Sequence, residues 1–209
     1  MAYPEPLARL IEELEKLPGI GPRSAERIAQ HLVKAGDPAA QRLARAIDEA
    51  VGSVRPCSTC CHLADLDPCP ICADADRDHR RVLVVERSRD LESLERAGWR
   101  GVYHVLHGAA RPDGQPNPEL TLAILERRIR AGDLDEIVLG TDPDFEGDGT
   151  ALMVAALVER CRRPGAPPIP VSRLARGVPA GTAIEYANPA VLAEALAERR
   201  PLPRGDAPP

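Results

Sequence analysis

The apolar residues of the first quarter of the chain recur every three or four positions, which is the spacing of amphipathic helices. The first series consists of Leu7, Leu10, Ile11 and Leu14 and ends at the Pro-Gly pair 18–19. A second series begins after Gly21, and Pro22 suits its first turn. A third series follows Pro38, and the side of that helix expected to be buried consists of Leu43, Ile47 and Val51. Residues 1–55 are therefore predicted to form a small all-α domain.

The pattern changes after residue 80, where short apolar runs alternate with helical spacing. The runs typical of buried strands are 81–86, 101–106 and 137–139. The helices predicted between and after them are 90–97, 118–131 and 147–161. The segment 169–174 suits an edge strand, because its proline cannot donate a hydrogen bond to a neighbour. This alternation predicts an α/β domain with a mainly parallel sheet and flanking helices over 80–175.

Three further segments complete the predicted organisation. Residues 56–79 hold a group of cysteines and an acidic linker. Residues 176–200 form a C-terminal strand and helix segment, with the helix expected over 189–199. Residues 201–209 are rich in proline and are expected to be a disordered tail.

Composition then narrows the class of protein. The 209-residue chain is 44% apolar and has a net charge of −5, so it does not suit coating nucleic acid through bulk charge, although a local basic patch is compatible with it. Nothing in the sequence approaches the ~20 apolar residues of a membrane span. The N-terminus has neither the basic start nor the apolar run of a secretory leader. We therefore expect a cytoplasmic protein with no membrane association, whose thiols are kept reduced.

The cysteine segment carries Cys57, Cys60, Cys69 and Cys72, which form two C-x-x-C pairs separated by eight residues. Each pair suits a tight turn that directs two thiolates toward one tetrahedral ion. In a reducing compartment such pairs favour a metal over disulfides. Four thiolates leave no open coordination position, so the spacing predicts a structural zinc site that stabilises its own loop.

Other interpretations of the cysteines stay open. Cys61 could replace Cys60 as a ligand, although the symmetric pairing favours Cys60. His62 is expected to face solvent and would be a ligand only if Cys60 were not. Buried reduced thiols are the plain alternative, and a redox role is disfavoured because neither pair lies between a strand and a helix. Cys161 is expected to be an ordinary buried cysteine.

The turn between the first two predicted helices is a candidate phosphate site. Gly19 and Gly21 let a phosphate approach the amide groups at the start of the second helix, where the helix dipole favours an anion. Lys16, Arg23 and Arg27 could add charged contacts that do not depend on base identity. The alternative is a plain helical corner closed by proline and glycine.

Carboxylates follow two of the predicted strands. Glu86 ends the first strand, and Asp142 and Asp144 follow the third. Because functional groups gather at the carboxyl ends of parallel strands, these three side chains are expected to converge and to offer hard oxygen ligands for Mg²⁺. An exposed acidic loop without a metal is the simpler alternative.

The motifs in this order resemble one family. The string LPGIGPRSAERIA resembles the helix-hairpin-helix of DNA repair proteins. The glutamate after the first strand and the D-x-D after the third resemble the Toprim domain of topoisomerases, primases and related nucleases. A helix-hairpin-helix, a four-cysteine zinc finger and a Toprim domain in about 200 residues resemble the RecR family of bacterial recombination mediators, over nearly the whole chain.

The resemblance implies a function and partners. RecR proteins load recombinase at single-stranded gaps together with RecO and RecF, and they are not known as enzymes. A homodimer or a ring-shaped homotetramer, sequence-independent DNA binding and association with the nucleoid are implied as well. A RecO-like partner is expected at Asp142, Asp144 and Glu146. The competing hypothesis is an Mg²⁺-dependent Toprim nuclease, with Glu86 as the base and the aspartates as metal ligands.

Overall fold

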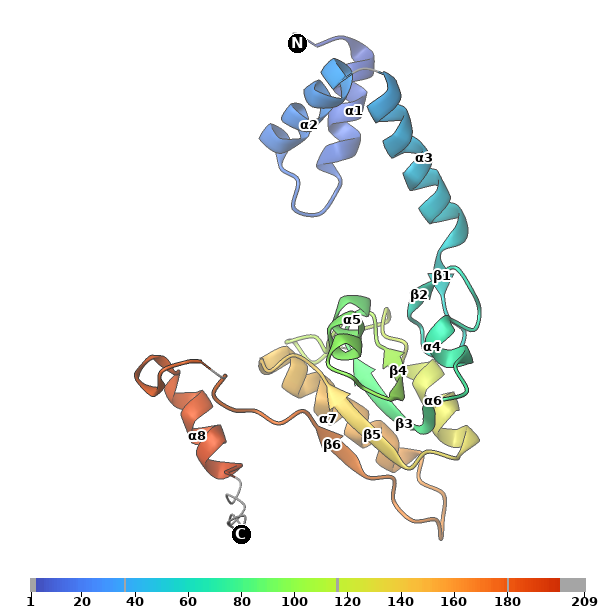
Figure 1. The fold of residues 1–209 in the computed structure, drawn as a ribbon, viewed down its shortest axis with the longest axis vertical. Helices are drawn as coiled ribbons and strands as arrows, with labels where there is room; N and C mark the ends of the chain where they lie inside the picture. Colours follow the sequence, from blue (N-terminus) through green and yellow to red (C-terminus); the bar gives the residue numbers. More distant parts are fainter. Residues whose placement is uncertain (1–2, 36, 116, 180, 200–209) are drawn as a thin grey trace, which may run out of the picture. The chain divides into compact units, whose positions relative to one another are not determined.

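The chain is described by a computed structural model that covers residues 3–35, 37–115, 117–179 and 181–199 (Figure 1). Its internal contacts divide it into two compact units, Met1–Val54 and Arg55–Pro209. The predicted disordered tail, 201–209, lies outside the described residues. No helix in the described part of the chain has both the length and the apolar composition needed to cross a membrane.

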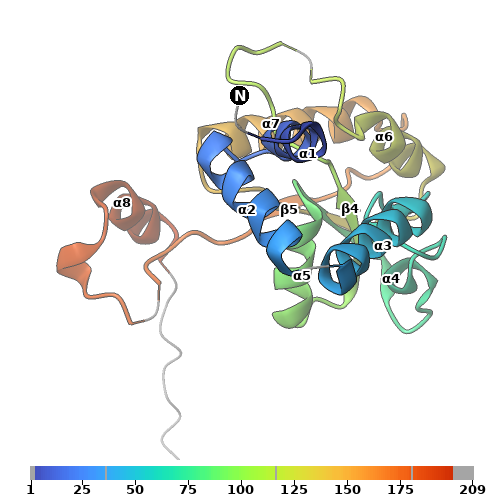
Figure 2. The same ribbon diagram turned by 90° about the horizontal axis from the view of Figure 1, so that it is seen from above.

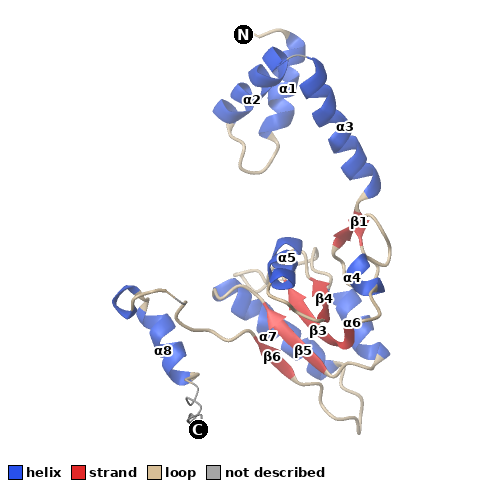
Figure 3. Cartoon of the chain, viewed as in Figure 1, coloured by secondary structure: helices blue, strands red, loops and turns tan. Residues whose placement is uncertain are grey.

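The first unit consists of the helices α1 (Glu5–Glu15), α2 (Pro22–Ala35) and α3 (Asp37–Ser53), drawn in blue in Figure 3. Pro22 occupies the first turn of α2, where its missing N–H is not needed for a helical hydrogen bond. Ala25 and Ala29 are fully buried on α2, and their small side chains allow close packing between α1 and α2. The small all-α architecture predicted for this part of the chain is confirmed.

The expected burial of the third helix is wrong for this chain. Leu43, Ile47 and Val51 on α3 are 44%, 53% and 72% exposed, respectively. The helical spacing was identified correctly, but spacing predicts only that one face is apolar and not that another element buries it. An apolar face left in water costs free energy that burial against another surface would recover.

The second unit is built around a four-stranded parallel sheet of order β4-β3-β5-β6. The strands are β3 (Asp78–Val85), β4 (Gly101–Val105), β5 (Glu136–Gly140) and β6 (Val171–Arg173). The helices that connect or follow them are α5 (Ser88–Arg96), α6 (Leu122–Ala131) and α7 (Phe145–Arg160). The mainly parallel sheet is confirmed, and β6 lies at its edge as predicted, with Pro170 just before the strand rather than within it.

Side chains of alternate strand residues point to opposite faces of this sheet, and each face has its own core. Val82 and Val84 of β3 pack with Leu125 of α6 and with α7 on one face. Leu83 and Val85 pack on the other face with Leu91 of α5. Figure 2 shows α6 and α7 on one side of the strands and α5 on the other. Both faces are buried in the second half of β3, along β4 and in the centre of β5, which are the apolar runs of the sequence, whereas the first half of β3 and all of β6 are exposed.

Several boundaries differ from the predicted ones. Helix α6 begins at Leu122 rather than at 118, because Asn117 forms a turn and the Thr121 hydroxyl donates to the Val105 carbonyl at 2.7 Å. The C-terminal helix α8 (Pro189–Ala197) ends two residues before the predicted boundary, and the strand predicted before it in 176–200 is wrong, because the described residues there contain a 3-10 turn instead. The remaining elements are β1 (Arg55–Pro56), β2 (Leu63–Ala64), α4 (Pro70–Ala73) and a 3-10 turn, Ile184–Tyr186. These were not predicted, because elements of two to four residues have no periodicity to detect.

Candidate metal centre and neighbouring sites

The four predicted zinc ligands converge in the second unit. The sulfur atoms of Cys57, Cys60, Cys69 and Cys72 all lie within 4.8 Å of one another. The antiparallel pair β1–β2 frames the first C-x-x-C, and Cys69 immediately precedes the short helix α4, which carries Cys72. A local turn thus holds each pair, and hydrogen bonds from Ser58 to Asp67 join the two halves of the segment. The term zinc knuckle is used below for residues 57–72.

The donor set fits zinc. Cys60 Sγ and Cys69 Sγ are 3.6 Å apart, close to the separation of about 3.8 Å that two sulfurs at about 2.3 Å from a tetrahedral ion require. Hydrogen bonding from Cys72 lowers the pKa of the Cys60 thiol to about 5, and the same contact raises the pKa of Cys72. The protein alone thus favours one thiolate in the cluster. A divalent cation would be needed to stabilise four thiolates together.

The alternatives for the second ligand are resolved by this geometry. Cys60 belongs to the sulfur cluster, whereas Cys61 packs into the sheet core beside Leu83 and Tyr103. His62 was predicted to face solvent, but its side chain is half-buried. Its Nε2 lies 3.9 Å from Glu92 Oε1. Glu92 belongs to α5, an element distant in the sequence, so this contact could not be predicted from the sequence of the loop.

The zinc knuckle is hydrogen-bonded directly to the end of β4. The Val105 amide donates to the Cys60 carbonyl at 2.8 Å. Two residues along, His107 Nε2 lies 2.7 Å from the Cys61 carbonyl oxygen. Cys61 and His107 both have a φ of 63°, a left-handed conformation that is uncommon without glycine. The turn that carries a zinc ligand is thus part of the sheet edge rather than a separate appendage.

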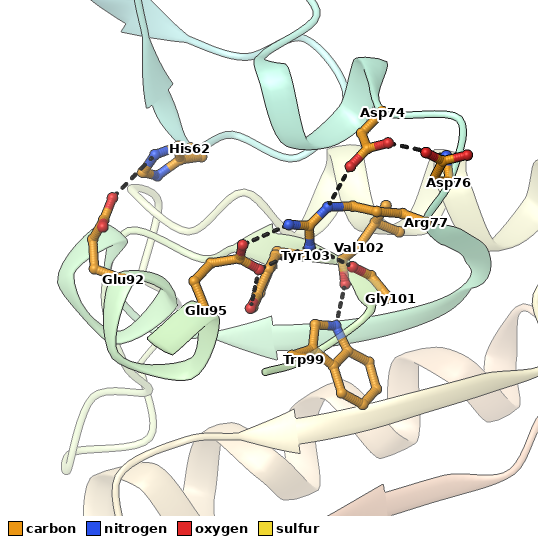
Figure 4. A network of polar contacts seen from close by, with 10 residues as sticks. All are labelled: His62, Asp74, Asp76, Arg77, Glu92, Glu95, Trp99, Gly101, Val102 and Tyr103. Carbon is orange, nitrogen blue, oxygen red and sulfur yellow. Dashed lines mark hydrogen bonds and ion pairs between the residues drawn. The ribbon is translucent and has the colours of Figure 1, made fainter. Parts of the chain in front are cut away.

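A second polar network fixes the segment that leaves the zinc knuckle (Figure 4). Arg77 donates to both carboxylate oxygens of Glu95 and pairs with Asp74, which follows α4. The fully buried Tyr103 donates its hydroxyl to Glu95 at 2.7 Å. Such a buried, charge-assisted network is stabilising only while each member keeps its partner. It joins the knuckle, α5 and β4 into one body.

The carboxyl ends of β3 and β5 carry the predicted acidic residues, here called the acidic edge: Glu86, Asp142, Asp144 and Glu146. Glu86 is only 2% exposed, and its Oε1 has no hydrogen-bond partner among the described residues. Burial, and secondly the charge of Asp142, raise the pKa of Glu86 from 4.5 to about 7. At neutral pH this carboxyl group is therefore divided between its protonated and ionised forms.

The other members of the acidic edge are engaged with different partners. Asp142 Oδ2 lies 3.2 Å from Arg87 Nη1, in a half-exposed ion pair. Asp144 caps α7, accepting a hydrogen bond from the Gly147 amide at 2.8 Å. Glu146 is exposed. Among the described residues, only the four cysteines bring three or more ligand atoms close enough for one ion. The Mg²⁺ site stays a prediction.

The N-terminal hairpin has the predicted turn. Gly19 has a φ of +80°, and nothing lies within 4 Å of the place where a side chain would begin on either Gly19 or Gly21. Arg23 and Arg27 are exposed on α2, and neither forms an ion pair with another described residue. Lys16 is exposed and pairs with Glu13 at 2.7 Å. The turn is thus open to a ligand. Arg23 and Arg27 could contact that ligand without first breaking an ion pair, whereas Lys16 would have to leave Glu13.

Two residues at these sites were not identified from the sequence. Gly147 is required by a close approach, because a Cβ atom there would collide with the Asp142 carbonyl oxygen. The sequence did contain a signal for this role, because a glycine stands within an acidic motif at the predicted start of a helix. His107 joins the zinc knuckle to the sheet, and nothing in the spacing of the sequence indicated that contact.

Comparison with known families divides the chain into three successive matches. The family described as "RecR, helix-hairpin-helix" matches residues 7–51. The RecR zinc finger domain family, whose description specifies four cysteine ligands, matches residues 54–74. The Toprim domain family matches residues 80–175. The zinc finger match covers all four cysteines of the cluster, so the bound ion is a structural zinc.

Curated relatives match along nearly their whole length. A protein of Anaeromyxobacter dehalogenans named "Recombination protein RecR" is 48% identical over 204 residues, which is 97% of this chain and all of the relative. Proteins with the same name from Desulforudis audaxviator and Pelotomaculum thermopropionicum are 45% and 44% identical, over 96% and 95% of this chain and 99% and 97% of their own lengths.

Proposed function

The chain belongs to the RecR family of recombination proteins, and on this premise we propose that it is a non-enzymatic mediator that encircles DNA at single-stranded gaps. The DNA-binding role is assigned to residues 1–55, and partner binding to the Toprim domain over 80–175. Residues 56–79 would support the Toprim sheet through zinc, and residues 176–200 would contribute to oligomer contacts. RecO-like and RecF-like proteins are the proposed partners in recombinase loading at the nucleoid.

The single observation that carries the proposal is the open hairpin turn. Two exposed arginines, Arg23 and Arg27, flank the start of a helix whose first amides can face a phosphate. These groups recognise the backbone and not the bases, so binding would be independent of sequence and sensitive to salt. Residues 1–55 carry eight basic and eight acidic side chains, which predicts weak binding by one subunit.

Assembly would compensate for that weakness. Exposed apolar side chains are found both on α3 and near the C-terminus of the described chain. Those on α3 include Leu43 and Ile47, and those near the C-terminus are Ile184, Tyr186 and Leu196. Exposed apolar surface of this kind favours a second copy of the chain as the partner. A homodimer or homotetramer would hold several hairpins at a high effective concentration on one DNA.

The acidic edge suits protein recognition. Asp142, Asp144 and Glu146 lie at the carboxyl end of the sheet, beside Arg87, where a basic partner could form ion pairs. Arg87 already pairs with one oxygen of Asp142, and the cap of α7 uses one oxygen of Asp144, so Mg²⁺ would share these carboxylates with both contacts. A RecO-like partner could use the remaining oxygens and the exposed Glu146.

The decisive experiment follows both cleavage and retention on DNA. Purified protein is incubated with gapped DNA, circular or linear, in Mg²⁺ or Mn²⁺. A clamp is expected to stay on circles, slide off linear molecules and leave both uncut. Arg23→Ala is expected to reduce binding several-fold at low salt, while Arg42→Ala, an exposed change on α3 away from the turn, should leave it near the wild-type value.

Three outcomes would contradict parts of the proposal. DNA cleavage by the wild type that disappears in Asp142→Asn would favour the nuclease hypothesis over the mediator hypothesis. Equal retention of the protein on circular and linear DNA would show that it does not encircle DNA as a ring. Unchanged low-salt binding in Arg23→Ala would remove the hairpin from the DNA interface.

A further inference from the structure

The zinc centre poses an electrostatic problem that its four ligands do not solve. Four thiolates around one Zn²⁺ leave a net double negative charge, and three of the four cysteines are buried. A buried charge is costly unless a counter-charge or hydrogen-bond donors compensate for it. Within the knuckle, the amides of His62 and Cys69 donate to the sulfurs of Cys60 and Cys57 at 3.4 Å, but these donors carry no full positive charge. A counter-charge is therefore sought on an element packed against the zinc knuckle.

Helix α6 of the Toprim domain is such an element. Ile124 of α6 and Ile71 of α4 both pack against the same core cluster, which contains Cys61 and Tyr103. Residues four positions apart lie on one side of a helix, so Arg128 follows Ile124 along the side of α6 that approaches the knuckle.

The guanidinium of Arg128 is held in place at that point. Its Nη1 donates to the Tyr103 carbonyl at 2.6 Å, two residues before the Val105 amide that binds Cys60. Burial lowers the pKa of Arg128, and the thiols of Cys72, Cys60, Cys57 and Cys61 oppose that effect. The guanidinium is thus anchored on the strand whose end is hydrogen-bonded to the zinc knuckle.

Arg128 also lacks an alternative counter-charge. The neighbouring Arg130 pairs with Glu126 at 2.7 Å, and Arg127 is exposed. Arg128 forms no ion pair with any carboxylate in the described ranges, although it is half-buried. A half-buried arginine with no carboxylate partner among the described residues and a mostly buried anionic cluster compensate for each other.

We propose that Arg128 is the outer-sphere cation of the zinc centre, positioned by the Tyr103 carbonyl, and that it makes zinc retention depend on the folded Toprim domain. Groups in this position orient the ligands and stabilise their ionised form without touching the metal. The zinc knuckle would then hold its ion tightly only when α6 is docked against β4.

The test compares three variants of the full-length zinc-loaded protein. Arg128→Gln keeps a donor for the Tyr103 carbonyl but removes the charge. Arg128→Lys keeps the charge but loses the planar fork. Arg127→Gln, on the exposed neighbouring position, is the matched control. Zinc transfer to an excess of a chromogenic chelator gives the release rate, and circular dichroism confirms the fold.

A charge role predicts that Arg128→Gln releases zinc about tenfold faster or more, that Arg128→Lys stays within about threefold of the wild type, and that Arg127→Gln is unchanged. The proposal would be overturned if Arg128→Gln released zinc at the wild-type rate. It would also be overturned if the Gln and Lys substitutions accelerated release equally. If Arg128→Gln does not fold, cobalt-loaded Arg128→Met, which keeps the length of the side chain but removes its charge, decides. A shifted sulfur-to-cobalt charge-transfer band supports the proposal, and an unchanged band refutes it.

Discussion

The zinc knuckle and the acidic edge both gather residues that bind cations, yet only one of them forms a compact ligand set among the described residues. The four cysteine sulfurs lie within 4.8 Å of one another. At the acidic edge, Asp142 pairs with Arg87, Asp144 caps α7 and Glu86 is buried with one oxygen unpartnered in the described structure. Both regions belong to the same unit and meet the same sheet.

The difference lies in what positions each group. Each C-x-x-C places two thiols on one tight turn, and a thiol has few other strong partners in a protein. A carboxylate is a strong acceptor for arginines and for helix N-termini, so Asp142 and Asp144 find partners nearby. Clustering in sequence therefore identifies a cysteine site more securely than a carboxylate site.

The largest effect should come from breaking the sulfur cluster. Cys57→Ala is expected to abolish zinc binding and to lower the free energy of unfolding by about 5 kcal/mol or more, because metal binding supplies the folding energy of the knuckle. Zinc content by mass spectrometry and thermal unfolding measure both quantities.

Cys61→Ala is the matched control, since Cys61 adjoins a ligand but packs into the sheet core. It should keep its zinc and lose only about 1 kcal/mol. A variant at Cys57 that remains folded and assembled without zinc would show that the knuckle does not depend on its metal.

A smaller effect is expected at the backbone of the acidic edge. Gly147→Ala would push a Cβ atom into the Asp142 carbonyl oxygen, and both must move apart. A loss of about 3 kcal/mol is expected from chemical denaturation, because a buried backbone contact cannot relax as a side chain can.

The control is Gly149→Ala, two residues further along α7. Its added Cβ would meet the Ala110 side chain at 3.5 Å, an ordinary contact, and alanine favours the helix. Equal losses in the two variants would mean that the acidic loop does not need the close approach at Gly147.

The smallest of the three effects concerns the protonation of Glu86. Its folded pKa of about 7 lies above the ordinary value of 4.5, so the folded state binds its proton more tightly. Stability should therefore fall as pH rises from about 4.5 to 7 and then level off. Glu86→Gln removes this dependence, and should be more stable than the wild type by about 2–3 kcal/mol at pH 8 but only slightly at pH 5.

Denaturant unfolding at the two pH values measures the effect. Glu146→Gln, an exposed change at the same edge, should alter stability at neither pH. A pH-independent difference between Glu86→Gln and the wild type would mean that Glu86 is ionised throughout, and would make a tightly bound cation at the edge the better explanation.

Most of the second unit could be predicted from the sequence. The buried parts of β3, β4 and β5 are apolar runs, and Pro170, just before β6, indicated an edge strand there. Local spacing was also sufficient for the zinc ligands, because each pair needs only its own turn. The start of α6 was predicted too early, since the contact that positions it joins Thr121 to Val105, a residue of another element.

The sequence by itself determined what short-range physics decides: helical faces, buried strands, the cysteine pairs and the glycine turn. Tertiary structure alone decided which partner each polar group has. It paired Asp142 with Arg87 and partly buried the side chain of His62. It also left Leu43 and Ile47 exposed and brought Arg128 toward the thiols. The reason is that periodicity specifies an apolar or charged face, whereas burial and pairing depend on which distant element packs against it.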